Sequence, residues 1–254
     1  MRRLFRSRAS ESAARDELKP AEFPSIRGAE LAADFTARRV AGDFYDSIRV
    51  NPERVLFGLL DVAGPRQDNR HILIAAQETF RKAGTELFSP PDINEADVMI
   101  ELNFRINRRV LEMASGVRSC PAFLGCYHER FGTLCFSNAG HTPGLLRDNS
   151  GITELGSTGL PLGLFSHATS DARIVAVERG AALLLVSRGV ISCEARRNGG
   201  SEEFGLGRVK EFFQNANMTS AQDLCARVLN SSAEFTRGAP VCDDRTALAL
   251  LRKV

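Results

Sequence analysis

The chain has 254 residues, of which 43% are hydrophobic and 25% are charged, a balance typical of a soluble globular protein. Its 33 basic residues against 31 acidic residues give no general electrostatic case for binding nucleic acid or a membrane surface. No apolar run approaches the roughly 18–20 residues that a bilayer-spanning helix needs, so no membrane span is predicted.

Cysteine usage indicates the compartment. The six cysteines form no C-x-x-C pair and lie mainly in apolar runs, which predicts buried, reduced thiols and gives no hint of a zinc site. The N-terminal segment lacks the apolar core of a secretion signal, so we expect a cytoplasmic protein. The cysteines are Cys120, Cys126, Cys135, Cys193, Cys225 and Cys242.

Residues 1–20 are rich in arginine and poor in large apolar groups, and we interpret them as a mobile basic tail. Residues 21–254 are expected to form one domain. Within it, residues 23–40 are predicted to be extended, and residues 40–62 contain two apolar, β-prone runs that predict a hairpin.

Two helices are predicted after the hairpin. The first spans about residues 68–87, with Asp68 as its N-cap, and the second follows Asp92 as its cap. Apolar residues at helical spacing form one stripe along the second helix, which indicates a face packed on the core. They are Met99, Leu102, Ile106, Val110 and Met113.

After Gly116 the pattern changes to short apolar or alternating runs separated by Gly, Pro and Asn turns. Two helices are predicted within this half, at about residues 209–216 and 221–235, the second capped by Ser220. The order of elements predicts an α+β fold with mainly antiparallel sheets. The predicted strands are residues 122–128, 133–137, 144–147, 172–177, 182–186 and 246–251.

The hairpin carries the first candidate functional residues. If its strands pair, Asp43 and Asp61 come together over a hydrophobic floor, and two buried carboxylates that close repel each other unless a cation or a proton intervenes. A hard divalent cation with oxygen ligands satisfies this arrangement. The alternative is that both aspartates cap turns at strand ends.

Three further polar clusters adjoin strands, at residues 137–143, 186–190 and 242–246. With the hairpin motifs they resemble the SpoIIE-type bacterial serine phosphatases, a branch of the metal-dependent PPM (type 2C) protein phosphatases. The resemblance runs from about Leu18 to the C-terminus. The matching motifs occur in the family's order at residues 41–46, 61–64, 137–143, 159–163, 203–205 and 243–246.

This resemblance implies an α/β/β/α sandwich of two mainly antiparallel sheets flanked by helices, with a metal site at one end. In the family, aspartates hold two Mn²⁺ or Mg²⁺ ions, and metal-bound water attacks the phosphoserine phosphorus. Carried over to this chain, the catalytic metal ligands are Asp43, Asp61 and Asp243 with the Val62 carbonyl. The supporting residues are Gly42, His141 and Asp244.

Two of the remaining motifs are expected to be structural. The resemblance places His141 in a turn below the site, with a role as general acid as the alternative. Residues 159–163 are expected to form a packed turn.

The sequence departs from the family at Arg188, where a metal-binding aspartate is usual. An arginine cannot bind a metal, and the exchange changes the local charge by two units. Three readings are open. In the first, one metal remains and Arg188 either points away or binds the substrate phosphate. In the second, Arg188 replaces a metal and pairs with Asp43 or Asp243, and in the third it is a surface residue. Residues 65–70 are a second departure from the family sequence. They predict an altered loop shape after Gly64, near the site.

The function expected from the resemblance is a divalent-metal-dependent protein serine/threonine phosphatase, with two, one or no metals bound in this chain. Its substrate would be a phosphorylated regulatory protein of the anti-sigma-factor-antagonist type. The alternative is a catalytically impaired pseudophosphatase that binds such a partner. The sequence does not indicate the oligomeric state.

Overall fold

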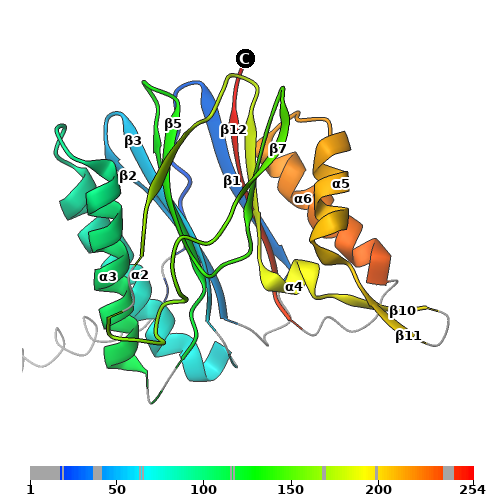
Figure 1. Ribbon diagram of the computed structural model, residues 1–254, viewed down its shortest axis with the longest axis horizontal. Coiled ribbons are helices and arrows are strands. Elements are labelled where there is room, and N and C mark those ends of the chain that lie inside the picture. The colour runs from blue at the N-terminus through cyan, green and yellow to red at the C-terminus, as the bar shows by residue number, and fades with distance from the viewer. Residues whose placement is uncertain are drawn as a thin grey trace, which may run out of the picture.

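The computed structural model describes residues 18, 20–36, 42–62, 64, 66–114, 116, 118–167, 170–197, 200–236 and 243–254. It consists of two five-stranded antiparallel sheets packed face to face, with helices on both outer faces (Figure 1). The β1 sheet has the order β1 (Ala29–Thr36), β12 (Arg245–Arg252), β9 (Ala182–Val186), β6 (Gly144–Asp148) and β7 (Gly151–Leu155). The β2 sheet has the order β2 (Gly42–Asn51), β3 (Arg54–Val62), β4 (Ala122–His128), β5 (Thr133–Ala139) and β8 (Arg173–Ala176).

Two helices cover each sheet (Figure 1). On the β2 sheet lie α2 (Arg66–Phe88) and α3 (Glu95–Met113), and on the β1 sheet lie α5 (Gly205–Asn215) and α6 (Ala221–Thr236). The predicted α/β/β/α sandwich is thereby confirmed. A short helix, α4 (Arg188–Ile191), and a small hairpin of β10 (Glu194–Arg197) and β11 (Gly200–Glu203) follow β9.

The layers are held by three apolar cores. One lies between α2, α3 and the β2 sheet, one between α5, α6 and the β1 sheet, and one between the two sheets. All nine residues of β3 are buried because the strand is covered on both faces. This explains why residues 55–60, between the charged Arg54 and Asp61, are continuously apolar rather than alternating. Each buried aliphatic or aromatic side chain contributes roughly 1.5–3 kcal/mol to this packing.

The predicted elements all occur, with different ends. Helix α2 begins at Arg66, so Asp68 lies in its first turn rather than at its cap. Helix α3 is capped by Asn94, whose side chain accepts hydrogen bonds from the N–H groups of the next turn, so the assignment of Asp92 was wrong. Asn94 has the extended backbone of an N-cap, directly before the helix. The Ser220 cap of α6 is confirmed by its hydrogen bond from the Asp223 N–H.

Four elements were not predicted from the sequence: β7, the strands β10 and β11 of the small hairpin, and α4. These elements are short, and many side chains of β7 and β11 are exposed. Their sequences therefore carry little hydrophobic periodicity. Residues 1–17 and 19 of the predicted tail lie outside the described residues, as do residues 37–40 of the predicted extended segment. Leu18, which the predicted tail includes, packs against the core beneath α2.

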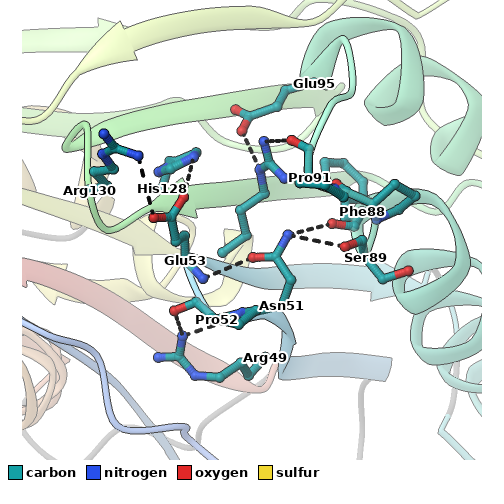
Figure 2. Close-up of polar contacts among 12 residues, drawn as sticks. Arg49, Asn51, Pro52, Glu53, Phe88, Ser89, Pro91, Glu95, His128 and Arg130 are labelled. Carbon is teal, nitrogen blue, oxygen red and sulfur yellow. Dashed lines mark hydrogen bonds and ion pairs between the residues drawn. The ribbon is translucent and has the colours of Figure 1, made fainter.

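The turn between β2 and β3 is fastened to the connection between α2 and α3 (Figure 2). The Asn51 amide donates to the Phe88 carbonyl at 3.0 Å. The Arg54 guanidinium binds Glu95 at 2.7 Å and the carbonyls of Pro90 and Pro91 at 3.0 and 3.1 Å. These contacts set the position of the helical layer on the sheet at one end of the hairpin. The candidate site lies at the other end.

The five described cysteines are buried and free, as predicted, and Cys242 lies outside the described residues. Among the described helices, none has the length and apolar character needed to traverse a bilayer.

Candidate active site

Strands β2 and β3 place Asp43 directly opposite Asp61. Both side chains leave the β2 sheet on the face toward the β1 sheet, where Asp43 meets Thr246 of β12. Gly42 makes this end of the hairpin narrow, because a Cβ atom there would lie 2.6 Å from the Val62 carbonyl oxygen. The predicted pairing of the two aspartates is therefore present, between the sheets rather than in an isolated turn.

The β1 sheet supplies the opposing wall through β9 and β12. The Ser187 N–H donates to the Thr246 carbonyl at 2.9 Å, and the Thr246 N–H donates to Ser187 Oγ at 3.0 Å. The Thr246 hydroxyl donates to Asp43 Oδ2 at 2.7 Å, so it joins the two sheets at the site. This hydrogen bond fixes the orientation of one carboxylate before any ligand binds.

Asp243 and Asp244 enter the site immediately before β12. The Asp244 N–H donates to Asp243 Oδ1 at 3.0 Å, and the Asp244 side chain is buried. Gly189, in α4, packs so closely on this segment that a Cβ atom would lie 2.0 Å from the Asp244 carbonyl oxygen. A glycine is therefore required there, and it allows α4 to approach the aspartate pair.

The carboxylates are placed in an unfavourable environment for negative charge. Burial, and then the charge of Asp61, raise the pKa of Asp43 to about 7, although hydrogen bonds from Ser187 and Thr246 oppose the change. Burial also raises the pKa of Asp61; the charge of Arg188 opposes this change, and the charges of Asp243 and Asp244 add to it. Such a group of buried, mutually repelling carboxylates is stabilised by a bound cation.

Arg188 supplies the one cationic side chain that contacts this group among the described residues. Its Nη2 lies 3.3 Å from Asp243 Oδ2, and its Nε lies 3.8 Å from Asp61 Oδ2. Of the two predicted alternatives, Asp43 or Asp243, the pairing with Asp243 is observed, and Arg188 also contacts Asp61. The side chain is 61% exposed, so it is a surface residue that nevertheless reaches into the site.

The donor set fits a hard divalent cation in part. Asp43, Asp61 and the Val62 carbonyl present oxygen atoms of the kind that Mg²⁺ and Mn²⁺ prefer. Within the described ranges, however, no three Asp, Glu, His or Cys side chains converge closely enough to form a ready metal site. Arg188 holds Asp61 and Asp243, where a second cation would need their charge. The arrangement fits one cation on the Asp43 side better than two.

The second departure, at residues 65–70, contains a residue that organises the site. The Asn69 side chain is buried, and its amide donates to the Val62 carbonyl at 3.3 Å and to the Gly64 carbonyl at 3.0 Å. The loop after β3 is therefore held against the first turns of α2. Pro65 and the side chains of residues 66–68 lie outside the description.

His141 lies in a buried turn closed by Asn138. The His141 N–H donates to Asn138 Oδ1 at 2.8 Å, and no hydrogen bond or ion pair joins its ring to a described carboxylate. Burial lowers its pKa to about 4. A turn position agrees with the structural interpretation of His141, whose role remains a prediction. Residues 159–163 form the expected packed turn, paired with Cys120 through both Leu162 backbone groups.

Sequence reasoning missed Ser187, Thr246 and Asn69. Ser187 and Thr246 belong to motifs that were recognised, but a hydroxyl residue beside an arginine gives no signal of its hydrogen-bond partner. The bond from Thr246 to Asp43 spans 203 positions of the chain. The sequence analysis treated Asn69 only as one of the bulky polar residues by which the 65–70 segment differs from the family. Nothing in the local pattern shows that its side chain binds back to the end of β3.

Comparisons with known proteins agree with this architecture. The model of the family Stage II sporulation protein E (SpoIIE) matches residues 51–253, a region that begins after Asp43. A search of curated proteins found no significant sequence match.

Solved structures of low sequence identity share the fold. The SiaA-PP2C domain of Pseudomonas aeruginosa has a TM-score of 0.74 at 19% identity, covering 88% of this chain and 86% of its own. The RsbU and RsbW domains of Rv1364c from Mycobacterium tuberculosis give 0.68 at 21% identity, over 89% of this chain and 60% of theirs. RsbX in complex with magnesium gives 0.64 at 11% identity, over 91% and 98%.

The family match covers most of the chain, and the fold agrees with it independently. The chain spans 60% of the length of the Rv1364c structure, which contains a further domain. The chain belongs to the SpoIIE family, and it has the fold of the SiaA-PP2C domain.

Proposed function

We propose that this protein is a divalent-metal-dependent phosphatase that hydrolyses phosphoserine or phosphothreonine on a regulatory protein. The observation that carries the proposal is the Asp43–Asp61 pair, two carboxylates opposed across a hairpin with their pKa values raised by burial. A pair of this kind costs stability in the absence of a cation. A folded protein that keeps it has a use for bound positive charge.

The residues that would hold the cation are Asp43, Asp61 and the Val62 carbonyl. A divalent cation there would lower the pKa of water, orient it and offset charge on the transferring phosphoryl group. The Thr246 hydroxyl holds Asp43 in place from the opposite sheet, and the Asn69 amide fixes the Val62 carbonyl from α2. The chain thereby orients both sides of the cation site before the substrate arrives.

Arg188 has a defined part in this proposal. Arg188 occupies the position at which the family uses another aspartate, and it neutralises charge on Asp61 and Asp243. Because it is largely exposed, its guanidinium can turn from these carboxylates toward a phosphate. We therefore propose one cation and one arginine where relatives use two cations.

The substrate class follows from the family. A phosphorylated regulatory protein of the anti-sigma-factor-antagonist type is proposed as the partner, and the Rv1364c structure, which joins RsbU and RsbW domains, is a relative of matching fold. The free, buried thiols favour a reducing compartment, so the proposed location is the cytoplasm.

The contacts of Arg188 also favour a second candidate, a pseudophosphatase in which the arginine replaces the metal. The two candidates differ in whether the unmodified chain turns over substrate. Both retain the fold and a surface for a phosphorylated partner.

The deciding experiment measures Mn²⁺-dependent phosphate release from a small aryl phosphate by the wild type, Asp61→Asn and Arg188→Asp. Asp92→Asn is the matched control, because Asp92 is exposed and distant in sequence from every site residue. Turnover by wild type and Asp92→Asn, with a loss of at least about a thousandfold in Asp61→Asn, supports the enzyme. Calorimetric titration with Mn²⁺ provides a readout that is independent of activity.

A silent wild type with activity gained in Arg188→Asp would identify the pseudophosphatase and overturn the proposal. Silence of both, together with no Mn²⁺ binding in the titration, would overturn the metal site itself.

A further inference from the structure

A second arginine borders the candidate site, and the sequence motifs did not include it. Arg118 lies on the connection between α3 and β4, and its Nη1 is 3.2 Å from the position that a Cβ atom of Gly64 would occupy. Gly64 follows Asp61 and Val62 by a few residues. The guanidinium therefore lies against the loop that leaves the Asp43–Asp61 pair, in space that the missing side chain of Gly64 leaves open.

The backbone that carries Arg118 is firmly attached to the site. The Arg118 carbonyl oxygen lies 2.2 Å from where a Cβ atom of Gly163 would be, so this segment packs directly on the 159–163 turn. Three residues further on, the Pro121 carbonyl accepts the Asp61 N–H at 2.9 Å. Arg118 is thus positioned by the same short segment that pairs with Asp61.

The two arginines differ in what they contact. Arg188 is engaged by Asp61 and Asp243, whereas no hydrogen bond or ion pair joins Arg118 to another residue in the described part of the chain. Arg118 is half-buried, so part of its hydration is already lost. A guanidinium with its donors uncommitted and partly dehydrated is suited to a bidentate contact with an anion.

The start of α2 adds to the attraction for an anion at this place. Helix α2 begins at Arg66, two residues after the glycine that Arg118 covers, and it is 23 residues long. The unsatisfied N–H groups and the positive end of the helix dipole favour negative charge near its first turn. The carboxylates of the site repel an anion, so a phosphate needs such a positive group to approach them.

We propose that Arg118 binds the phosphate group of the phosphorylated substrate, a role that rests on the proposed function of the site. Arg118 takes the phosphate at the Gly64 side, and Arg188 lies on the Asp243 side. Binding of inorganic phosphate, the product, should depend on the same residue.

The test compares the wild type with Arg118→Ala and Arg118→Lys. Arg173→Ala is the matched control, since Arg173 is an exposed arginine on the edge strand β8. The KM for a phosphoserine peptide and the inhibition constant of inorganic phosphate are measured with Mn²⁺. Loss of a bidentate arginine–phosphate contact should raise both by roughly 10- to 100-fold in Arg118→Ala.

A phosphate-binding role makes specific demands on the variants. The turnover number should change less than KM, and Arg118→Lys should restore part of the affinity, because lysine keeps the charge but not the paired donors. A purely structural role would instead lower the melting temperature and the turnover number together. Arg118→Lys also keeps the test open if Arg118→Ala does not fold.

Calorimetric titration with inorganic phosphate separates this inference from the proposed catalysis. Phosphate binding that is weakened in Arg118→Ala supports the role of Arg118 even if the wild type releases no phosphate from any substrate. Turnover by the wild type, with KM and phosphate inhibition unchanged in Arg118→Ala, overturns the role while the proposed function stands. A wild type that neither binds phosphate nor turns over substrate overturns both.

Discussion

The two ends of the β2–β3 hairpin use charged residues in opposite ways. At the turn, Arg54 is paired with Glu95 and with two backbone carbonyls, and both side chains are about nine-tenths buried. At the open end, Asp43 faces Asp61, and the only cation that contacts the group within the described ranges is the exposed Arg188. The first end satisfies its charges internally, and the second leaves them in need of a ligand.

This difference shows how one hairpin serves both stability and function. Charges that are paired and hydrogen-bonded hold the helical layer on the sheet (Figure 2). Carboxylates that repel each other reduce stability until a cation arrives, and that deficit is available as binding free energy. The position of each end in the fold, rather than the residue types alone, decides which of the two behaviours results.

The largest expected effect is at the turn. Glu95→Ala should lower the free energy of unfolding by about 3–5 kcal/mol, because it leaves the buried Arg54 cation without its partner. Asp61→Asn, at the other end, should cost nothing or increase stability in metal-free buffer. Urea unfolding followed by circular dichroism measures both, and equal losses at the two ends would break the comparison.

The next effect is a pH dependence at the open end, measured with a chelator present. Because the pKa of Asp43 in the folded protein is about 7, above its usual 3.8, the folded state binds more protons than the unfolded state between about pH 4 and 7. The free energy of unfolding should therefore fall as pH rises through this window. A pKa change of this size corresponds to about 4 kcal/mol at most.

Asp43→Asn should remove most of this fall, which urea unfolding at pH 5 and pH 7.5 would detect. The buried His141 has the opposite sign, since its pKa is lowered to about 4 and its contribution grows as pH rises toward 6.5. It is present in both proteins and cancels in the difference. An equal fall in wild type and Asp43→Asn would show that the carboxylate pair is not the cause.

The smallest expected effect is at an exposed ion pair near the same turn, which can be compared with the buried Arg54–Glu95 pair. Arg130 lies 4.0 Å from Glu53, and both side chains are exposed, at 71% and 48% (Figure 2). Arg130→Ala should change the free energy of unfolding by less than about 1 kcal/mol, because exposed pairs are screened by solvent. A loss of stability as large as that of Glu95→Ala would mean that burial does not determine how much an ion pair contributes to the free energy of unfolding.

Much of the fold was predictable because its signals are local. The apolar run of β3, the helical stripe of α3 and the runs of β4 and β9 all follow from burial of one or two faces, and each has the predicted type. The ends were less predictable, because Asn94 rather than Asp92 caps α3 through hydrogen bonds that depend on the backbone at that residue. The β10–β11 hairpin has too few buried residues to leave a pattern.

By itself, the sequence determined an α+β order of elements and the motifs, and the sandwich was expected from the family that those motifs resemble. The hydrophobic pattern also predicted a hairpin that could bring Asp43 and Asp61 together, with capped turns as the alternative. Only the tertiary structure decided that Arg188 contacts Asp61 and Asp243, that Thr246 holds Asp43 and that Arg118 covers Gly64. These contacts join residues that are far apart in the chain. Their geometry is set by how the two sheets and the α3–β4 connection pack, which no local pattern records.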